Sequence, residues 1–352
     1  MIVSLDDERL VYSGRIDRSD AKRPEFIFPA TSLQFRFYGK KAVLTVENRG
    51  GAGWKYYAGV IADGAQSSRE LLQNGVVRLV LVDEEEEKEH EILFFKRQDS
   101  CHEMALVSLE LPDEGRLLAP PEKPELKIEV YGDSVSVGEV SEASDYAGKE
   151  DPQHFGEYTN SWYSYGWMAA RKLHAQIHLI AKSGIALMDG TGYYHEPDSI
   201  GMETVWDKVH FEPQSEMACG RERMQKDLWD FSQYTPQAVI VAIGQNDSYP
   251  HDYMKEDETC KRAVLWRSRY RMFLESLREK YPEAYIVCCT TLLIHDLSWD
   301  RSIASVCREM KDNKITYYRF RRTGKGTPGH LRIPEAEEMA EELASYVKSL
   351  GI

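Results

Sequence analysis

Apolar residues in the first third of the chain alternate with polar ones or form short β-branched and aromatic runs, a pattern typical of β-strands. The segments with this pattern are residues 32–38, 42–46, 57–62, 76–82, 91–95 and 105–111. Glycine and polar clusters separate them, and no helical period intervenes. Residues 1–118 are therefore predicted to form an all-β sandwich, with the acidic run 83–87 in a solvated turn between two strands.

A proline-rich segment separates this region from a second pattern. Three prolines between residues 117 and 126 remove backbone donors and stiffen the chain, so residues 119–125 are predicted to be a linker. Short apolar runs follow, at residues 126–131, 176–181, 238–243, 284–290 and, more weakly, 314–318. Helix-like stretches lie between and after them, at residues 161–173, 221–233, 259–281, 302–311 and 334–350. This alternation predicts a three-layer α/β domain over residues 126–352, with a parallel sheet of about five strands.

Several strand ends of this predicted domain carry residues suited to chemistry. Ligands of such sheets lie beyond the carboxyl ends of the strands. Ser134 follows the first strand on a tight turn into a helix, whose N–H groups suit a developing negative charge, although a serine helix cap explains the motif equally well. Gly184 and Asn246 follow the second and third strands and offer uncharged N–H donors. His330 follows the fifth strand, so the fold can bring this base beside Ser134.

Length and charge narrow the function classes. The 352 residues suit two domains, and 44 basic against 58 acidic residues give a net charge of −14. This charge repels phosphate backbones and anionic lipid, so neither nucleic acid nor a membrane is expected as a partner. The start of the chain lacks the pattern of a secretory signal. Six cysteines without a CxxC pair favour a reducing compartment, and a cytoplasmic location is expected.

Motifs for metals and nucleotides are weak. His174 and His178 have the i, i+4 spacing of a zinc pair, but they straddle a predicted helix end and strand start. The Gly-Thr-Gly at 190–192 lacks the third glycine of a dinucleotide site and follows the second strand. Neither a metal nor another cofactor is expected.

The order of these blocks resembles a known superfamily. Gly132-Asp133-Ser134, Ser183-Gly184-Ile185, Gly244-Gln245-Asn246-Asp247 and a terminal loop histidine resemble the SGNH (GDSL-type) hydrolases across residues 126–352. In the front half, GRID at 14–17, PATSLQFRF at 29–37 and ADG at 62–64 resemble the jelly-roll domain of carbohydrate esterase family 2. The segments 273–282 and 295–300 fit that family as well. Its members remove acetyl groups from plant polysaccharides.

The resemblance implies a set of catalytic roles. Ser134 corresponds to the nucleophile and His330 to the general base and then acid. The oxyanion hole corresponds to the N–H groups of Ser134 and Gly184 and the side chain of Asn246. The implied reaction is removal of O-acetyl groups from mannan or xylan oligosaccharides through an acyl-enzyme.

One position departs from the superfamily. An aspartate usually lies three residues before the histidine, and Thr327 occupies that position here. Family 2 members are described as using a Ser-His dyad whose histidine is held by a backbone carbonyl, which implies the carbonyl of Pro328, with Thr327 as a second candidate. The alternative is an acid from another loop, tested at Asp247, Asp296 and Asp300.

Substrate contacts are predicted from loop residues near the strand ends. Aromatic faces stack on the C–H patches of sugar rings. The predicted substrate-binding residues are Trp299, Tyr249, Asp247, Tyr193 and Trp206. Two other functions stay open: an SGNH esterase, lipase or thioesterase on another acyl group, and a carbohydrate-binding protein with an inert site. The sequence also leaves open whether the substrate is mannan or xylan, which sugar hydroxyl carries the acetyl group, and the oligomeric state.

Overall fold

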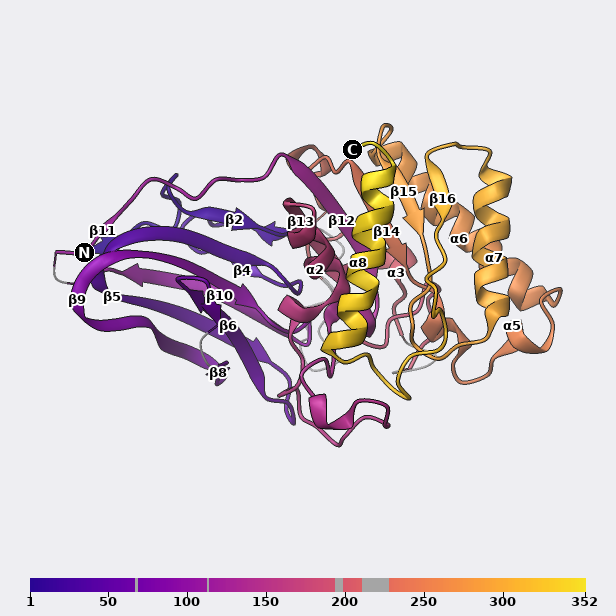
Figure 1. The fold of residues 1–352 in the computed structure, drawn as a ribbon, viewed down its shortest axis with the longest axis horizontal. Coiled ribbons are helices and arrows are strands. Elements are labelled where there is room, and N and C mark those ends of the chain that lie inside the picture. The colour runs from indigo at the N-terminus through magenta and orange to yellow at the C-terminus, as the bar shows by residue number, and fades with distance from the viewer. Residues whose placement is uncertain (67–68, 113, 194–198, 211–227) are drawn as a thin grey trace. The chain divides into compact units, whose positions relative to one another are not determined.

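The computed structural model describes the chain except for residues 67–68, 113, 194–198 and 211–227 (Figure 1). It divides into two compact units. The first contains residues 1–123, residues 154–157 and a stretch that begins at Val209, and the second contains the remainder. Each unit has its own sheet, antiparallel in the first and parallel in the second. The predicted fold class, an all-β part followed by an α/β part, is confirmed.

The sheet of the first unit is built on long antiparallel strands. Its main order is β3 (Ile16–Asp17), β4 (Glu25–Phe26), β10 (His102–Glu110), β5 (Ser32–Gly50), β9 (Gly75–Lys96), β6 (Tyr56–Ala62) and β7 (Ala65–Gln66). Short strands β1 (Ile2–Val3), β2 (Val11–Ser13), β8 (Glu70–Leu72) and β11 (Arg116–Leu117) pair alongside these. Alternate residues of β5 are fully buried in the core on each side of an irregularity near residue 40, Phe35 and Phe37 before it and Leu44 and Val46 after it.

Strands β5 and β9 are each continuous where the sequence predicts two shorter strands. Figure 1 shows both strands curving along their length. Between Gly39 and Lys41 on β5 the partner residue on β9 jumps from Lys88 to Asp83, so residues 84–87 lie opposite a single residue of β5 and form an irregularity of the ladder. The acidic run is exposed but lies within β9, and the predicted turn between two strands is wrong. Bulges let a long strand bend without ending, and the exposed irregularity leaves the like charges in water.

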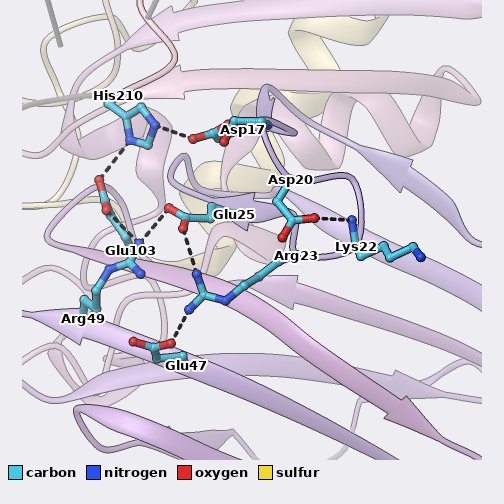
Figure 2. Close-up of polar contacts among 10 residues, drawn as sticks. Asp17, Asp20, Lys22, Arg23, Glu25, Glu47, Arg49, Glu103 and His210 are labelled. Carbon is cyan, nitrogen blue, oxygen red and sulfur yellow. Dashed lines mark hydrogen bonds and ion pairs between the residues drawn. The ribbon is translucent and has the colours of Figure 1, made fainter. Parts of the chain in front are cut away.

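A chain of alternating charges stabilises the first unit (Figure 2). His210 is buried between Asp17 and Glu103, with its ring nitrogens 3.0 and 3.1 Å from their carboxylates. Glu103 lies 3.4 Å from Arg49, which also contacts Glu25 at 2.7 Å. Burial opposes the charge on His210, but the bonds to the two carboxylates outweigh it and raise its pKa to about 9. His210 is therefore charged at neutral pH and fixes this part of the chain to β3 and β10.

The second unit has the predicted five-stranded parallel sheet. Its strands, β13 (Ala175–Ala181), β12 (Leu126–Gly132), β14 (Ala238–Ala242), β15 (Tyr285–Cys288) and β16 (Ile315–Tyr317), lie in the spatial order 2-1-3-4-5 of flavodoxin-like sheets. The first four are short runs buried over most of their length, which suits a covered parallel sheet, whereas the edge strand β16 is only partly buried. The strand order reverses around β12 and β14, and a crevice at their carboxyl ends is the expected ligand site.

Helices flank this sheet. The longer ones are α2 (Tyr165–Lys172), α6 (Lys261–Lys280), α7 (Leu297–Met310) and α8 (Ile333–Ser349). Short ones are α1 (Ser134–Val137), α3 (Met202–Val205) and α5 (Tyr253–Glu256). Helix α2 packs on α8, and α6 packs on α7. The predicted helix at 221–233 falls mostly outside the described residues. Among the described helices, none has the length and apolarity needed to cross a bilayer.

Candidate active site

Ser134 lies at the end of the central strand β12, in a turn that the sequence fixes locally. The strand ends at Gly132, where a Cβ atom would overlap the side chain of Ser136. Asp133 caps helix α1 by accepting the N–H of Val135 at 3.0 Å. The helix cap is thus Asp133, and the explanation of Ser134 as a cap is wrong. Ser134 is the first helical residue and is 5% exposed.

His330 is held by a carboxylate from a distant loop. Its Nδ1 lies 2.6 Å from Oδ2 of Asp151, and its backbone N–H donates to Oδ1 of the same residue at 3.0 Å. Arg332 contacts Asp151 at 3.0 Å. Burial raises the pKa of Asp151, but His330 and Arg332 outweigh burial and lower it to about 2. Asp151 is therefore ionised at neutral pH and fixes the orientation of the imidazole.

This contact corrects the expectation of a backbone carbonyl near Pro328. The hydroxyl of Thr327 instead accepts the N–H of Gly148 at 3.1 Å, and so joins the histidine loop to the segment that leads to Asp151. An acid from another loop does hold His330, but it is none of the three candidates. Asp247 accepts two backbone N–H groups of the loop after β13, Asp296 caps α7, and Asp300 binds His295 at 2.9 Å.

The predicted oxyanion donors follow β13 and β14, the two strands that flank β12. Asn246 donates its side-chain N–H to the carbonyl of Ile185 at 3.0 Å and lies 3.4 Å from Oδ2 of Asp133. Gly184, the residue before Ile185, has a φ of +75°, which favours glycine. Asp247 joins the two loops through bonds of 2.7 and 3.2 Å to backbone N–H groups after β13. The structure thus brings Asn246 to the turn that carries Ser134 and joins Asn246 to the loop that contains Gly184.

Glu139 joins the histidine to the serine turn. Its Oε2 lies 3.7 Å from Nε2 of His330, and its backbone N–H donates to the carbonyl of Ser134 at 3.1 Å. The first residue of α8, Ile333, also donates its N–H to Ser141 at 3.1 Å. These contacts bring the histidine loop close to the Ser134 turn, and the pairing of the Ser134 hydroxyl with His330 stays a prediction.

Two of the predicted aromatic residues lie at this edge of the sheet. Tyr193 and Tyr249 are 56% and 43% exposed, with ring centroids 5.0 Å apart. The backbone N–H of Tyr193 donates to Gly184 at 3.3 Å, and that of Tyr249 donates to Asn246 at 3.1 Å. An exposed aromatic pair therefore adjoins two of the oxyanion residues.

Three predicted substrate contacts are not exposed in this way. Trp299 is fully buried, with its ring against Trp266 and its indole N–H bonded to Asp252 at 3.0 Å. Asp247 is fully buried, and Trp206 packs in an aromatic cluster with Phe231 and Phe273. The expectations for Trp299 and Asp247 are wrong, because these side chains present no surface to a sugar. Trp206 is half-buried, and its substrate contact stays a prediction.

Sequence reasoning missed Asp151 and Glu139. Asp151 lies 179 residues before His330 in a segment without helical or strand periodicity, so no spacing signals it. Glu139 lies five residues after Ser134, and this closeness to the nucleophile was a usable signal.

A possible metal-ligand group occurs in the first unit. Among the described residues, Asp63, Glu84 and His90 each place one possible ligand atom within 4.8 Å of the other two. His90 already contacts Asp63 at 2.8 Å, and Lys88 pairs with Glu84 at 2.6 Å. The residues described around Ser134 form no such group.

Comparisons with known proteins cover both units. Residues 12–121 match the family model described as carbohydrate esterase 2 N-terminal. The chain is 27% identical over 98% of its length to cellulase/esterase CelE of Acetivibrio thermocellus, and it spans only 40% of that protein. It is 23% identical over 99% of its length to an acetylxylan esterase / glucomannan deacetylase of Cellvibrio japonicus, of which it covers 90%. A solved family two carbohydrate esterase from Clostridium thermocellum, in complex with cellohexaose, has a TM-score of 0.79 and 26% identity, covering 97% of this chain and 99% of that one.

Proposed function

We propose that this chain, whose resemblance to carbohydrate esterase family 2 extends over both units, is a serine esterase that removes O-acetyl groups from hemicellulose oligosaccharides. The observation that carries the proposal is His330, oriented by Asp151 and linked through Glu139 to the turn that carries Ser134. A relative named acetylxylan esterase / glucomannan deacetylase supports carbohydrate ester hydrolysis as the reaction, with xylan and mannan both as candidate substrates.

The first half of the reaction forms an acyl-enzyme. Asp151 accepts the Nδ1–H of His330, which leaves the lone pair of Nε2 free to take the proton of Ser134. The Ser134 oxygen attacks the acetyl carbonyl carbon, and the oxyanion accepts N–H donors from Ser134, Gly184 and Asn246. The carbon–oxygen bond to the sugar then breaks, and the sugar oxygen takes the proton from Nε2.

The second half releases acetate. Water gives a proton to Nε2 of His330 and attacks the acyl carbon, and the same three donors hold the second oxyanion. The bond to Ser134 breaks, and its oxygen recovers the proton. Each step uses only side chains and backbone groups of this chain and a water molecule.

The exposed aromatic pair favours a sugar over a long acyl chain. Tyr193 and Tyr249 adjoin the oxyanion donors, where flat rings can stack on a pyranose next to the ester. Given the expected cytoplasmic location, we propose imported acetylated oligosaccharides as substrates.

Acetate release tests this proposal. Acetylated mannan and xylan oligosaccharides are compared with long-chain nitrophenyl esters, and the product is read by NMR. Release of acetate from the sugars, lost in Ser134→Ala, supports the proposal. A preference for the long-chain esters identifies a different acyl substrate. Sugar binding without turnover of any ester identifies an inert binding protein.

A further inference from the structure

The side of the His330 ring that faces the serine turn carries a second carboxylate. Glu139 is only 9% exposed, and its Oε2 lies 3.7 Å from Nε2, the nitrogen that must accept the serine proton. Asp151 occupies the opposite nitrogen. The imidazole therefore lies between two acids, and the usual description of a triad leaves Glu139 without a role.

The backbone around Glu139 is held in an unusual conformation. Gly138 has a φ of +81°, and a Cβ atom there would lie 2.7 Å from the carbonyl oxygen of Asn160. Val140, on the other side, is a fully buried β-branched residue with a φ of +55°, which is rare for its type. The N–H of Asn160 bonds Gly138 at 3.1 Å, and the N–H of Glu139 bonds Ser134 at 3.1 Å. This rigid, strained turn fixes the Glu139 backbone beside the nucleophile, as strain at functional sites often does.

Four charged groups face His330 from the elements packed around it. Glu139 comes from the turn after α1, Asp133 from the turn before it, and Asp151 from the loop at 150–153. Arg332, on the same loop as the histidine, is engaged with Asp151 at 3.0 Å. Burial lowers the pKa of His330, but Glu139, Asp151 and Asp133 together outweigh burial and raise it.

We propose that Glu139 is a positioning residue that stabilises the protonated form of His330 and so sets the lower pH limit of the esterase. This inference rests on the proposed function. The imidazolium arises when His330 takes the Ser134 proton, so a carboxylate facing Nε2 assists acylation. The same carboxylate retains the proton to higher pH in the resting enzyme, and His330 is then unable to act as a base.

An NMR titration tests this without using activity. Histidine is labelled with carbon-13, and the His330 signal is identified by its loss in His330→Gln. In Glu139→Gln the pKa of His330 falls by about one pH unit, the lower end of the effect of an opposite charge a few ångströms away. Glu150→Gln is the matched control, because it removes an exposed charge next to Asp151, and its His330 pKa stays at the wild-type value.

The pH dependence of kcat/KM is the second measurement. In Glu139→Gln the acid limb moves down by the same one pH unit, and kcat on the plateau falls about tenfold, since one pKa unit corresponds to a factor of ten. Glu139→Asp keeps the negative charge but holds it one methylene further from His330, so it moves the acid limb in the same direction by a smaller amount.

Three results overturn the inference. An unchanged His330 pKa in folded Glu139→Gln does so, and a loss of rate without movement of the acid limb indicates a merely structural role. If circular dichroism shows that the Gln variant is unfolded, the Asp variant decides, and an unchanged His330 pKa there rejects the inference. Absence of esterase activity in the wild type rejects the proposed function instead, and the NMR titration still tests the Glu139 contact.

Discussion

Replacing Asp151 with asparagine tests the triad most directly. The carboxylate accepts Nδ1–H of His330 at 2.6 Å and the backbone N–H at 3.0 Å, and it contacts Arg332 at 3.0 Å. Asparagine has nearly the same shape as aspartate, but its single side-chain oxygen can accept a hydrogen bond from either Arg332 or the His330 ring, not from both. With the amide nitrogen towards Nδ1, the ring proton moves to Nε2, the atom that must accept the serine proton.

The expected loss is large. The same replacement in the serine protease triad lowers kcat about ten-thousandfold, which corresponds to about 5.5 kcal/mol of transition-state free energy. We expect a similar loss in Asp151→Asn, because the contact to Nδ1 is short and the carboxylate is ionised. If a backbone carbonyl held His330 instead, Asp151→Asn would lower kcat less than tenfold.

The assay is kcat on an acetylated oligosaccharide, with the fold checked by circular dichroism and thermal unfolding. The fold check matters because Arg332 is 1% exposed and loses its charged partner. Glu150→Gln, one residue away and exposed, is the control for charge alone. A folded Asp151→Asn protein that keeps more than a tenth of the wild-type kcat refutes the triad and returns the mechanism to a dyad.

Four further predictions concern single side chains. Ser134→Ala abolishes turnover and leaves sugar binding nearly intact, because its oxygen supplies the covalent step; calorimetric binding and acetate release check this, and more than a few per cent residual rate contradicts it. Asn246→Ala lowers kcat by about a hundredfold to a thousandfold with little change in KM, as steady-state kinetics will show; a change confined to KM indicates a substrate contact instead. Thr327→Ala lowers kcat/KM less than tenfold, because its hydroxyl bonds a backbone N–H and not the histidine; a larger loss means that this bond is needed to place Asp151. His210 has a pKa raised from 6.5 to about 9 in the folded state, so its stabilisation is complete below pH 6.5 and lost as pH rises through 9. The free energy of unfolding in urea should therefore fall over this pH range by up to about 3 kcal/mol more in the wild type than in His210→Gln, at 1.36 kcal/mol per pKa unit. Parallel plots of this free energy against pH for the two proteins contradict the prediction.

Local pattern in the sequence determined the two folds and half of the site. A period of two with no helical segments specifies an antiparallel sheet, because alternate side chains must face one core. Short apolar runs between helices specify a covered parallel sheet. Once that sheet is predicted, its carboxyl edge follows, and Ser134, Gly184 and Asn246 are placed by their position directly after three strands.

The tertiary structure alone decided what pairs with His330. Asp151 belongs to an irregular loop 179 residues away, and its approach depends on how that loop packs, for example on the bond from Gly148 to Thr327. Burial is decided in the same way. Trp299 is predicted to be a loop aromatic, yet it lies in the first turn of α7, and contact between α6 and α7 buries it against Trp266. Sequence periodicity records which face of an element is apolar, whereas contacts between loops depend on three-dimensional packing that has no period along the chain.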